Sequence, residues 1–520
     1  YTMFTLENML FYDKTFNDKH TLGVTLLQSI QEDKKENVNV AMENLPADNL
    51  KYYDLGSGLV TNTIGSSMIK WNMASFMGRI NYNYLGRYLL TVSARYDGSS
   101  RLADGHKWVL FPSAALAWRI NEESFMSSTS GWLDNLKLRL GFGKTGNSAV
   151  DPYQTKGTLS LIRYPFDNGG TPTIGYAPNA MANSLLTWET TDQWNLGIDF
   201  GVLRGRINGT IDLYMQNTHD LLLKRQLPVV SGFPDVLSNV GKTRNKGIEV
   251  SINSMNINSK DFQWTTDLML SSNKEEIVEL YNGKNDDIGS KWFIGQPVNV
   301  HYDYRKVGIW QNTESDLAEM AKFAANGTEF APGDIKIQDV NGDYKITDAD
   351  KQILGNPRPK LIASMVNTFN YKGFDLSVFL YASFGAMLYN DIYAVEHCGR
   401  NGGVKVDYWT PNNPTNAYPR PSIDEERPIY ITSTYYEKAD FLRVKTMTLG
   451  YTLPKTLTNK SLVEKLRVYF TAQNPFIFTN YTGIDPEAAK VNSAGNPETN
   501  GSGFGTPSVS SWIFGINLTL

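Results

Sequence analysis

RINGTIDLYMQ, at residues 206–216, alternates apolar and polar side chains along its whole length. The polar set is hydrophilic throughout, apart from the amphipathic Tyr214. Successive side chains of a β-strand point to opposite faces of its sheet, so this stretch predicts a strand with one apolar and one hydrophilic face. The apolar set is Ile207, Gly209, Ile211, Leu213 and Met215, and the opposing set is Arg206, Asn208, Thr210, Asp212, Tyr214 and Gln216.

The same alternation recurs along the chain, for example in WNLGIDFGV at 194–202 and SWIFGINLTL at 511–520. These segments are more numerous than the strands of a β-sandwich. Several exceed the common strand length of about five or six residues, as tilted membrane-crossing strands of about nine to eleven residues do. The pattern predicts about fifteen strands, near 5–13, 20–30, 68–83, 87–97, 110–120, 135–145, 188–202, 206–222, 241–255, 262–275, 360–371, 373–385, 440–453, 465–478 and 509–520.

The predicted connections between these strands alternate between short and long. This alternation is typical of an up-and-down barrel, in which short periplasmic turns alternate with long external loops. We therefore predict an all-β, transmembrane, antiparallel up-and-down β-barrel whose last strand runs inward and whose long loops lie outside. The short connections are 14–19, 84–86, 203–205, 256–261, 372 and 454–464, with one of intermediate length at 121–134, and the long ones are 31–67, 98–109, 146–187, 223–240, 276–359, 386–439 and 479–508.

Composition agrees with a membrane barrel and excludes several other classes of protein. The single cysteine, Cys398, excludes an internal disulfide framework and a cysteine zinc cluster. A net charge of -4 gives no electrostatic footprint for nucleic acid. No apolar run reaches the length of about 18 residues that a membrane-spanning helix needs, but a closed barrel crosses a membrane without one.

No linker, low-complexity tract or long charge run divides the chain. We therefore predict that residues 1–520 form the C-terminal portion of one transmembrane β-barrel domain. The chain opens directly into strand-like sequence with no signal peptide, so we interpret Tyr1 as a cut within a longer chain.

Several stretches resemble the SusC-like branch of the TonB-dependent outer-membrane transporters. They follow that family's order and span nearly the whole chain. One departure is Leu520, because outer-membrane barrels usually end in an aromatic residue, although Trp512 and Phe514 keep the pattern. The stretches are FMGRINYNYLGRYLLTVSARYDGSSRL (76–102), FPSAALAWRINEESFM (111–126), LKLRLGFGKTGN (136–147), NKGIEVSIN (245–253), GDIKIQDVNGDYKITDADKQILGNPRP (333–359), ADFLRVKTMTLGYTLP (439–454) and LRVYFTAQNPFIFTNYTGIDPE (466–487).

The resemblance implies a barrel of about 22 strands around a plug, of which about fifteen would lie in this chain. The first seven strands, the plug and the TonB-contacting segment would then lie outside it. It further implies active import of oligosaccharides, with a SusD-like surface lipoprotein as lid and TonB displacing the plug. We expect loops 276–359 and 386–439, the longest, to contact that lid. Import of oligopeptides by the same machinery, a passive porin and a surface adhesin remain alternatives.

DVNGDYKITDAD, at 339–350, places oxygen ligands at positions 1, 3, 5, 9 and 12 of an EF-hand-like loop. Two positions depart from the pattern, because Tyr344 replaces the usual glycine at position 6 and an aspartate replaces the glutamate at position 12. The motif predicts a structural calcium site, with an ion-free Asp/Asn/Gly-rich turn as the alternative. The predicted ligands are Asp339, Asn341, Asp343, Lys345 through its carbonyl, Thr347 and Asp350.

Aromatic residues in the long loops are candidate platforms for a ligand, because sugar rings and peptide side chains pack on flat apolar faces. The alternative is that they pack the loops together or against the lid. No catalytic set is recognisable, so we predict that the chain is not an enzyme. The predicted substrate-binding residues are Trp292, Trp310, Tyr389, Trp409, Tyr435 and Tyr436, with Tyr393, Arg400, Asn401, Asp407 and Tyr408 as further candidates.

Overall fold

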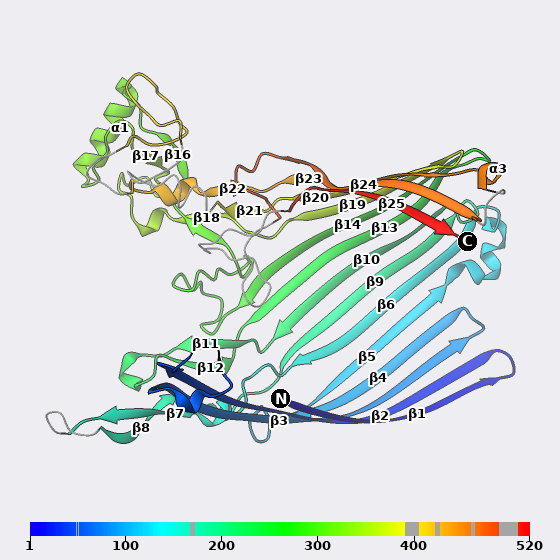
Figure 1. Cartoon of the computed structure of the whole chain (residues 1–520), viewed down its shortest axis with the longest axis horizontal. Coiled ribbons are helices and arrows are strands. Elements are labelled where there is room, and N and C mark those ends of the chain that lie inside the picture. Colours follow the sequence, from blue (N-terminus) through cyan, green and yellow to red (C-terminus); the bar gives the residue numbers. More distant parts are fainter. Residues whose placement is uncertain are drawn as a thin grey trace.

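One antiparallel sheet of fifteen strands forms the body of the protein (Figure 1). The computed structural model describes residues 1–47, 49, 51–166, 172–390, 405–421, 427–458, 463–487 and 508–520. The strands are, in order across the sheet, β1 (Thr2–Phe16), β2 (His20–Glu43), β3 (Val60–Tyr84), β4 (Tyr88–Ser99), β5 (Trp108–Arg119), β6 (Leu133–Asn147), β9 (Glu189–Val202), β10 (Ile207–His219), β13 (Lys242–Asn258), β14 (Phe262–Glu279), β19 (Leu361–Tyr371), β20 (Phe374–Phe384), β23 (Phe441–Thr452), β24 (Lys465–Thr479) and β25 (Ser511–Thr519).

The order of strands in the sheet is the order of the chain, which is the up-and-down topology that the sequence predicts. Each of the fifteen strands contains one of the predicted segments or most of it. The tight turns gather at one end of the sheet and the long connections at the other (Figure 1). The C-terminus lies at the turn end. The predicted alternation of short and long connections is therefore confirmed.

The long connections carry small elements of their own. Most of these are two-stranded antiparallel sheets, and one is an α-helix of 12 residues. They are the pairs β7 (Thr158–Tyr164) and β8 (Thr173–Ala180), β11 (Leu222–Gln226) and β12 (Asp235–Asn239), β15 (His301–Asp303) and β18 (Gln352–Gly355), β16 (Lys306–Ile309) and β17 (Ile335–Ile337), and β21 (Met387–Tyr389) and β22 (Tyr436–Lys438), with helix α1 (Glu314–Ala325); a short helix α3 (Lys455–Thr458) lies at the turn end.

Strands β2 and β3 extend well beyond their predicted ends. The segment 31–67, predicted as a loop, is mainly strand, because β2 continues to Glu43 and β3 starts at Val60. The run EDKK at 32–35 obscured this strand in the sequence. In the structure two of its charges are ion-paired: Glu32 with Lys70 of β3, at 2.9 Å between Oε1 and Nζ, and Lys34 with Glu36 on the same strand. Exposed ion pairs between neighbouring strands are compatible with β-structure.

The two faces of the sheet differ in chemistry, as the register of β10 shows. Ile211 lies opposite Ile198 of β9 and Val250 of β13. Asp212, the next residue, points to the other face and lies opposite Glu249. The alternation within one strand is therefore matched across its neighbours, which builds one continuous apolar face and one polar face. In a membrane barrel the apolar face meets lipid and the polar face lines the interior.

A row of aromatic rings crosses the apolar face at the turn end. Tyr88 stacks between Tyr84 and Trp118, with ring centroids 6.3 and 6.4 Å apart. Tyrosine and tryptophan are favoured where the lipid tails meet the polar headgroups, because their rings are amphipathic. Two other aromatic residues of the sheet lie away from this row: Trp188 is buried beneath the external connections, and Tyr469 lies on the polar face that it shares with Arg467.

The sheet has two free edges within the described residues. β1 pairs with β2 alone, and β25 pairs with β24 alone. Side chains along both edge strands are exposed on both of their faces, including Leu10 at 65% and Phe514 at 84%. The backbone groups of these two edges need partners before the sheet can lie in lipid.

Within the part of the chain that the structure describes, no helix combines the length and the apolarity of a membrane-spanning segment.

The opposite environments of the two faces predict opposite responses to the same charge. We expect Ile211→Arg to destabilise the folded protein by about 2–4 kcal/mol, because it places a cation against lipid near the middle of a strand. Thr210→Arg, one residue away on the polar face, should cost less than about 1 kcal/mol because its charge faces water. Urea unfolding of the full-length protein in lipid vesicles measures both. Equal costs for the two substitutions would contradict the assignment of the faces.

Candidate functional site

The described parts of the two longest connections fold into one unit at the external end, which we call the external module (280–360, 385–390, 405–421 and 427–440). It projects beyond the end of the sheet in Figure 1. The module contains α1 and the pairs β15–β18, β16–β17 and β21–β22. Helix α1 starts where the Thr313 hydroxyl accepts a hydrogen bond from the backbone N–H of Asp316 at 3.3 Å, which is an ordinary N-cap.

A buried apolar cluster joins the two connections within the module. Two hydrogen bonds reinforce it: Trp409 Nε1 donates to Gln311 Oε1 at 2.9 Å, and Lys306 Nζ donates to the carbonyl of Ala417 at 2.8 Å. Burial lowers the pKa of Lys306 to about 8. The module is thus one packed body, not two independent loops. Its cluster consists of Ile309, Ile335, Ile337, Trp409, Tyr418, Ile431 and Tyr435.

A second cluster holds α1 against the rest of the module. The Trp310 ring is fully buried against Phe323 of α1 and Phe330, with ring centroids 5.9 and 5.5 Å away. The Lys336 ammonium lies 4.0 Å from the centre of the Trp310 ring, close enough for a cation–π contact.

Three of the six predicted substrate-binding aromatics are buried in these clusters. Trp310, Trp409 and Tyr435 are 0%, 6% and 1% exposed. Their burial contradicts a role as ligand platforms, because no ring face is open to a ligand. They act instead as packing residues, which was the alternative. The sequence could not separate the two roles because both call for aromatic residues in loops.

The other three predicted aromatics are partly accessible. Tyr389 packs edge-on against Tyr436, with ring centroids 5.5 Å apart, and the Tyr436 hydroxyl donates to Asp303 Oδ2 at 3.1 Å. Trp292 lies in a turn, where its backbone pairs with that of Asp287. Ligand binding by these three stays a prediction.

Of the additional polar and aromatic candidates, the structure describes Asp407 and Tyr408. Asp407 is held by hydrogen bonds from Thr415 and Asn413, at 2.7 and 2.9 Å, and next to it Tyr408 is exposed. The remaining three candidates, Tyr393, Arg400 and Asn401, lie outside the described residues.

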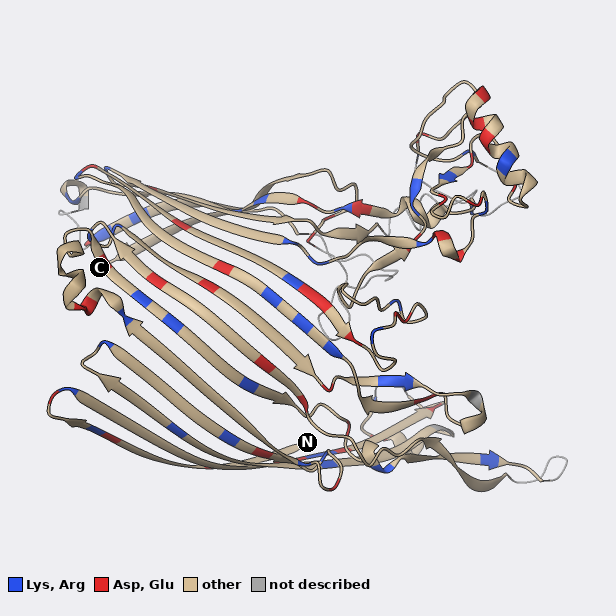
Figure 2. Ribbon diagram, turned by 180° about the vertical axis from the view of Figure 1, so that it is seen from behind, with Lys and Arg blue, Asp and Glu red and all other residues tan. Residues whose placement is uncertain are grey.

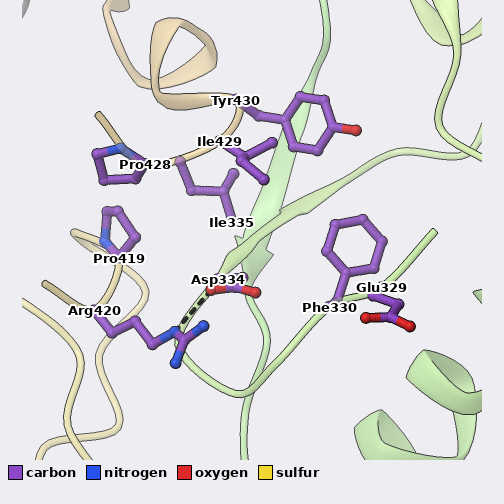
Figure 3. A pocket seen from close by; sticks show the side chains of 9 residues that line it. All are labelled: Glu329, Phe330, Asp334, Ile335, Pro419, Arg420, Pro428, Ile429 and Tyr430. Carbon is purple, nitrogen blue, oxygen red and sulfur yellow. Dashed lines mark hydrogen bonds and ion pairs between the residues drawn. The ribbon is translucent and has the colours of Figure 1, made fainter. Parts of the chain in front are cut away.

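A small cavity lies where 329–335 meets 419–430 (Figure 3). Arg420 Nε donates to Asp334 Oδ1 at 2.8 Å along one side of it. The cavity volume is about 40 Å³, far below the several hundred Å³ of typical ligand pockets, so we interpret it as a packing gap inside the module. Its lining residues are Glu329, Phe330, Asp334, Ile335, Pro419, Arg420, Pro428, Ile429 and Tyr430.

The predicted calcium loop is a compact turn in which side-chain oxygens accept backbone hydrogen bonds. Asp339 accepts from the N–H groups of Gly342 and Tyr344, both at 2.8 Å. Tyr344 has a φ of 57°, the left-handed conformation expected of position 6. Asp343 accepts from the N–H of Lys345 at 2.8 Å and from the Asn341 amide at 2.9 Å.

Asp350, the last predicted ligand, has a structural role here. Its side chain is fully buried, and its two oxygens accept from the N–H groups of Val340 and Thr347 at 2.9 and 2.8 Å. Together with Thr347 it forms a capping box. Within the described residues no three acidic, histidine or cysteine side chains converge as a metal site would require. Calcium binding by this loop therefore stays a prediction.

The polar face of the sheet carries a network of paired charges near mid-strand (Figure 2). Arg139 of β6 donates to Asp199 of β9 at 2.7 Å and to Asp212 of β10 at 3.0 Å. Gly197 lies between these residues, and a Cβ there would come within 2.5 Å of the guanidinium carbon. The glycine thus leaves the space in which one arginine bridges two strands.

Other arginines on this face are also paired with aspartates. Arg95 donates to Asp97 at 2.7 Å, and Arg467 donates to Asp375 at 2.5 Å. The alternation in the sequence predicts that these residues share the hydrophilic face, but we did not predict their pairing. Arg95 and Asp97 lie two residues apart on β4, whereas Arg467 of β24 reaches Asp375 of β20 across the intervening strand β23.

The connection between β24 and β25 folds back onto this face. Arg443 of β23 is buried and donates to Asp485 of that connection at 2.5 Å, and Lys445 donates to Glu487 at 2.6 Å. The described start of this connection therefore adds paired charged groups to the polar face, as suits the lining of an aqueous path.

Residues 4–475 match the sequence profile of the family described as TonB dependent receptor-like, beta-barrel. This chain belongs to that family. Its members are outer-membrane β-barrels, so the protein is located in the outer membrane, and its apolar face is the lipid face. The family is one of receptors and transporters, not of enzymes.

Two curated relatives and one solved structure illustrate the similarity. TonB-dependent receptor P3 of Formosa agariphila is 32% identical over 98% of this chain and 52% of its own length. TonB-dependent receptor SusC of Bacteroides thetaiotaomicron is 35% identical over 80% of this chain and 41% of its own length, which confirms the SusC-like resemblance. The chain thus spans about half the length of these relatives. A structure of the RagAB peptide transporter matches with a TM-score of 0.81 at 23% identity, over 99% of this chain and 55% of that one.

The calcium prediction can be tested on the full-length protein in detergent. After chelator treatment, addition of about 1 mM calcium should slow amide hydrogen exchange in the peptide 339–351, because several carboxylate oxygens would then be tied to one ion. Asp343→Ala should abolish this protection. Asp348→Ala serves as the matched control, because that exposed carboxylate lies in the same loop but is not a predicted ligand. Exchange that is unaffected by calcium in the unaltered protein would contradict the prediction.

Proposed function

We propose that the protein containing this chain imports oligosaccharides actively across the outer membrane. In this proposal it is a SusC-like TonB-dependent transporter, and a SusD-like lipoprotein closes its external mouth. TonB displaces a plug that, with the remaining strands of the barrel, belongs to the part of the transporter outside this chain. These strands would pair with the free edges of β1 and β25 and close the sheet.

The observation that carries the proposal is the continuous polar face. It presents hydroxyl, amide and already paired charged groups, among them the Thr91, Ser93 and Ser113 hydroxyls, which bond to neighbouring strands. A solute that moves along such a surface replaces hydrogen bonds to water with hydrogen bonds to the protein, and these must be of similar strength at each step. A polyhydroxylated oligomer meets this requirement, whereas an apolar ligand does not.

The external module supports the presence of a lid. Several of its large apolar side chains are exposed although its core is well packed, including Leu317 at 45% on α1 and Ile429 at 59%. Exposed apolar residues around the mouth of a transporter offer a contact surface for a partner protein. The lid proposed here would rest on this module, in agreement with the expectation for loops 276–359 and 386–439.

An oligopeptide is the second candidate substrate, because its amides would suit the same polar face. The matching RagAB structure is titled a peptide transporter, but at that level of identity the match establishes the fold alone. We favour oligosaccharides on the SusC-like sequence resemblance, and the test below includes both solutes.

Import and lid binding can be measured together in cells that produce the full-length transporter. We expect uptake of a radiolabelled oligosaccharide mixture to stop when a protonophore dissipates the proton-motive force. The variant Leu317→Glu/Ile429→Glu should lose the co-purifying lipoprotein and at least half of the uptake, because charges replace apolar contacts. Val230→Glu is the matched control, because it alters an exposed apolar side chain in a different external connection.

Three outcomes would contradict the proposal. Uptake that persists without the proton-motive force would favour a passive porin. Uptake of a radiolabelled peptide mixture in place of oligosaccharides would favour peptide import. Retention of the lipoprotein by Leu317→Glu/Ile429→Glu would place the lid elsewhere.

A further inference from the structure

A large cavity lies at the external end of β3, away from the external module. It opens where β3 continues beyond the last residue of β4 and where the connections 100–107 and 148–157 fold over that gap. Its volume is about 500 Å³, within the range of ligand-binding pockets. The lining residues are Met68, Lys70, Trp71, Asn72, Ser100, Leu102, Ala103, Asp104, Lys107, Pro152, Tyr153, Thr155, Lys156 and Ser184.

The cavity has a positive lining. Lys70, Lys107 and Lys156 line it beside one aspartate, Asp104. Lys70 is paired with Glu32 of β2 and Lys107 with Asp104, so the surplus positive charge of the lining is that of Lys156. Lys107 Nζ lies 2.5 Å from Asp104 Oδ1, and this contact lowers the pKa of Asp104. Among the described residues no carboxylate lies within ion-pair distance of Lys156, so its ammonium is available for an anionic ligand.

A further cation, Arg101, contacts the lining residue Trp71. The Arg101 guanidinium lies 3.9 Å from the centre of the Trp71 ring, in cation–π contact. The Nε of Arg101 is buried and has no hydrogen-bond partner. Arg101 therefore adds positive potential at the cavity that no protein carboxylate offsets within the described residues.

Tyr153 provides a fixed aromatic surface at the mouth of the cavity. Its hydroxyl accepts a hydrogen bond from the backbone N–H of Lys70 at 3.2 Å, and 46% of the residue is exposed. Its φ is 72°, a left-handed conformation that costs energy in a residue with a large side chain. The ring is thus held in place while its surface stays open to solvent.

The floor of the cavity is rigid. Leu102 is buried in a cluster with Val150, Leu186 and Trp188, which joins the connections that form the walls. Trp188 Nε1 donates to the carbonyl of Lys107 at 2.8 Å and so fixes the backbone of one of the lysines. The cationic groups therefore project from a preformed frame, which lowers the entropy cost of ligand binding.

We propose that this cavity binds an acidic sugar unit, one that carries a carboxylate or a sulfate ester. Lys107 and Lys156 would bind the anionic group, and the sugar ring would pack on Tyr153. The Ser100, Thr155 and Ser184 hydroxyls in the lining suit the sugar's own hydroxyl groups. The inference rests on the proposed import of oligosaccharides and assigns their class. A lipid phosphate needs cations but not this aromatic and hydroxyl-bearing surface, so we favour the sugar.

Binding to the full-length transporter in detergent tests this proposal by calorimetry. The probes are tetragalacturonate, a sulfated carrageenan tetrasaccharide and neutral cellotetraose. We expect at least one acidic probe to bind at least tenfold more tightly than cellotetraose. Lys107→Gln/Lys156→Gln should weaken that acidic probe about tenfold, as expected for loss of charge-assisted hydrogen bonds, and added salt should weaken it too.

Two further variants distinguish the effect of the positive charges in the cavity from the effect of the protein's overall charge. Lys107→Arg/Lys156→Arg keeps the cations and should restore most of the binding. Lys224→Gln/Lys274→Gln removes two exposed lysines from other external positions and should leave binding unchanged.

Equal binding of acidic and neutral probes would overturn the proposal, as would an acidic probe that binds Lys107→Gln/Lys156→Gln and the unaltered protein equally. Loss of co-purifying lipopolysaccharide from this variant, without any change in glycan binding, would identify a lipid site and would also overturn it. Continued energy-dependent uptake of neutral oligosaccharides in any of these cases would leave the proposed import intact.

Discussion

Every backbone N–H and C=O group of a strand in the hydrocarbon layer must bond to a neighbouring strand, because lipid offers no donors or acceptors. β10 meets this constraint fully, since residues 207–219 pair with β9 on one side and with β13 on the other. Within the described residues, the inner strands of the fifteen-stranded sheet, from β2 to β24, are likewise each bonded to two neighbours, so the open edges of this sheet are those of β1 and β25. Closure of the barrel through these two edges is therefore the condition on which the proposed transporter depends.

Once the ladder of hydrogen bonds sets the register, it also decides which side chains meet. Ile211 is brought against Ile198 and Val250 on one face, while Arg139 reaches Asp199 and Asp212 on the other. The same backbone pairing therefore makes the lipid surface and the polar lining together. The external connections are free of this constraint, and they fold instead around small apolar clusters such as that of Trp310.

The period of two in the sequence was sufficient to predict the fold, because alternation in strands such as 206–216 is a local property. The parity of the connections was sufficient to predict the up-and-down topology and the grouping of the long connections at one end of the sheet. The loops were harder, because aromatic residues serve packing and ligand binding equally well, and only burial distinguished Trp409 from Tyr436. The cationic cavity was not predicted, because Lys70, Lys107 and Lys156 come together only where β3 extends beyond the end of β4.

The central claim is that alternate residues of one strand face lipid and water. Single cysteines placed along β10, with Cys398 replaced by alanine, test it most directly in the full-length protein in lipid vesicles. A membrane-impermeant maleimide should label positions 208, 210 and 212 and spare positions 209, 211 and 213. Labelling that does not alternate, or that favours the apolar set, would contradict the account.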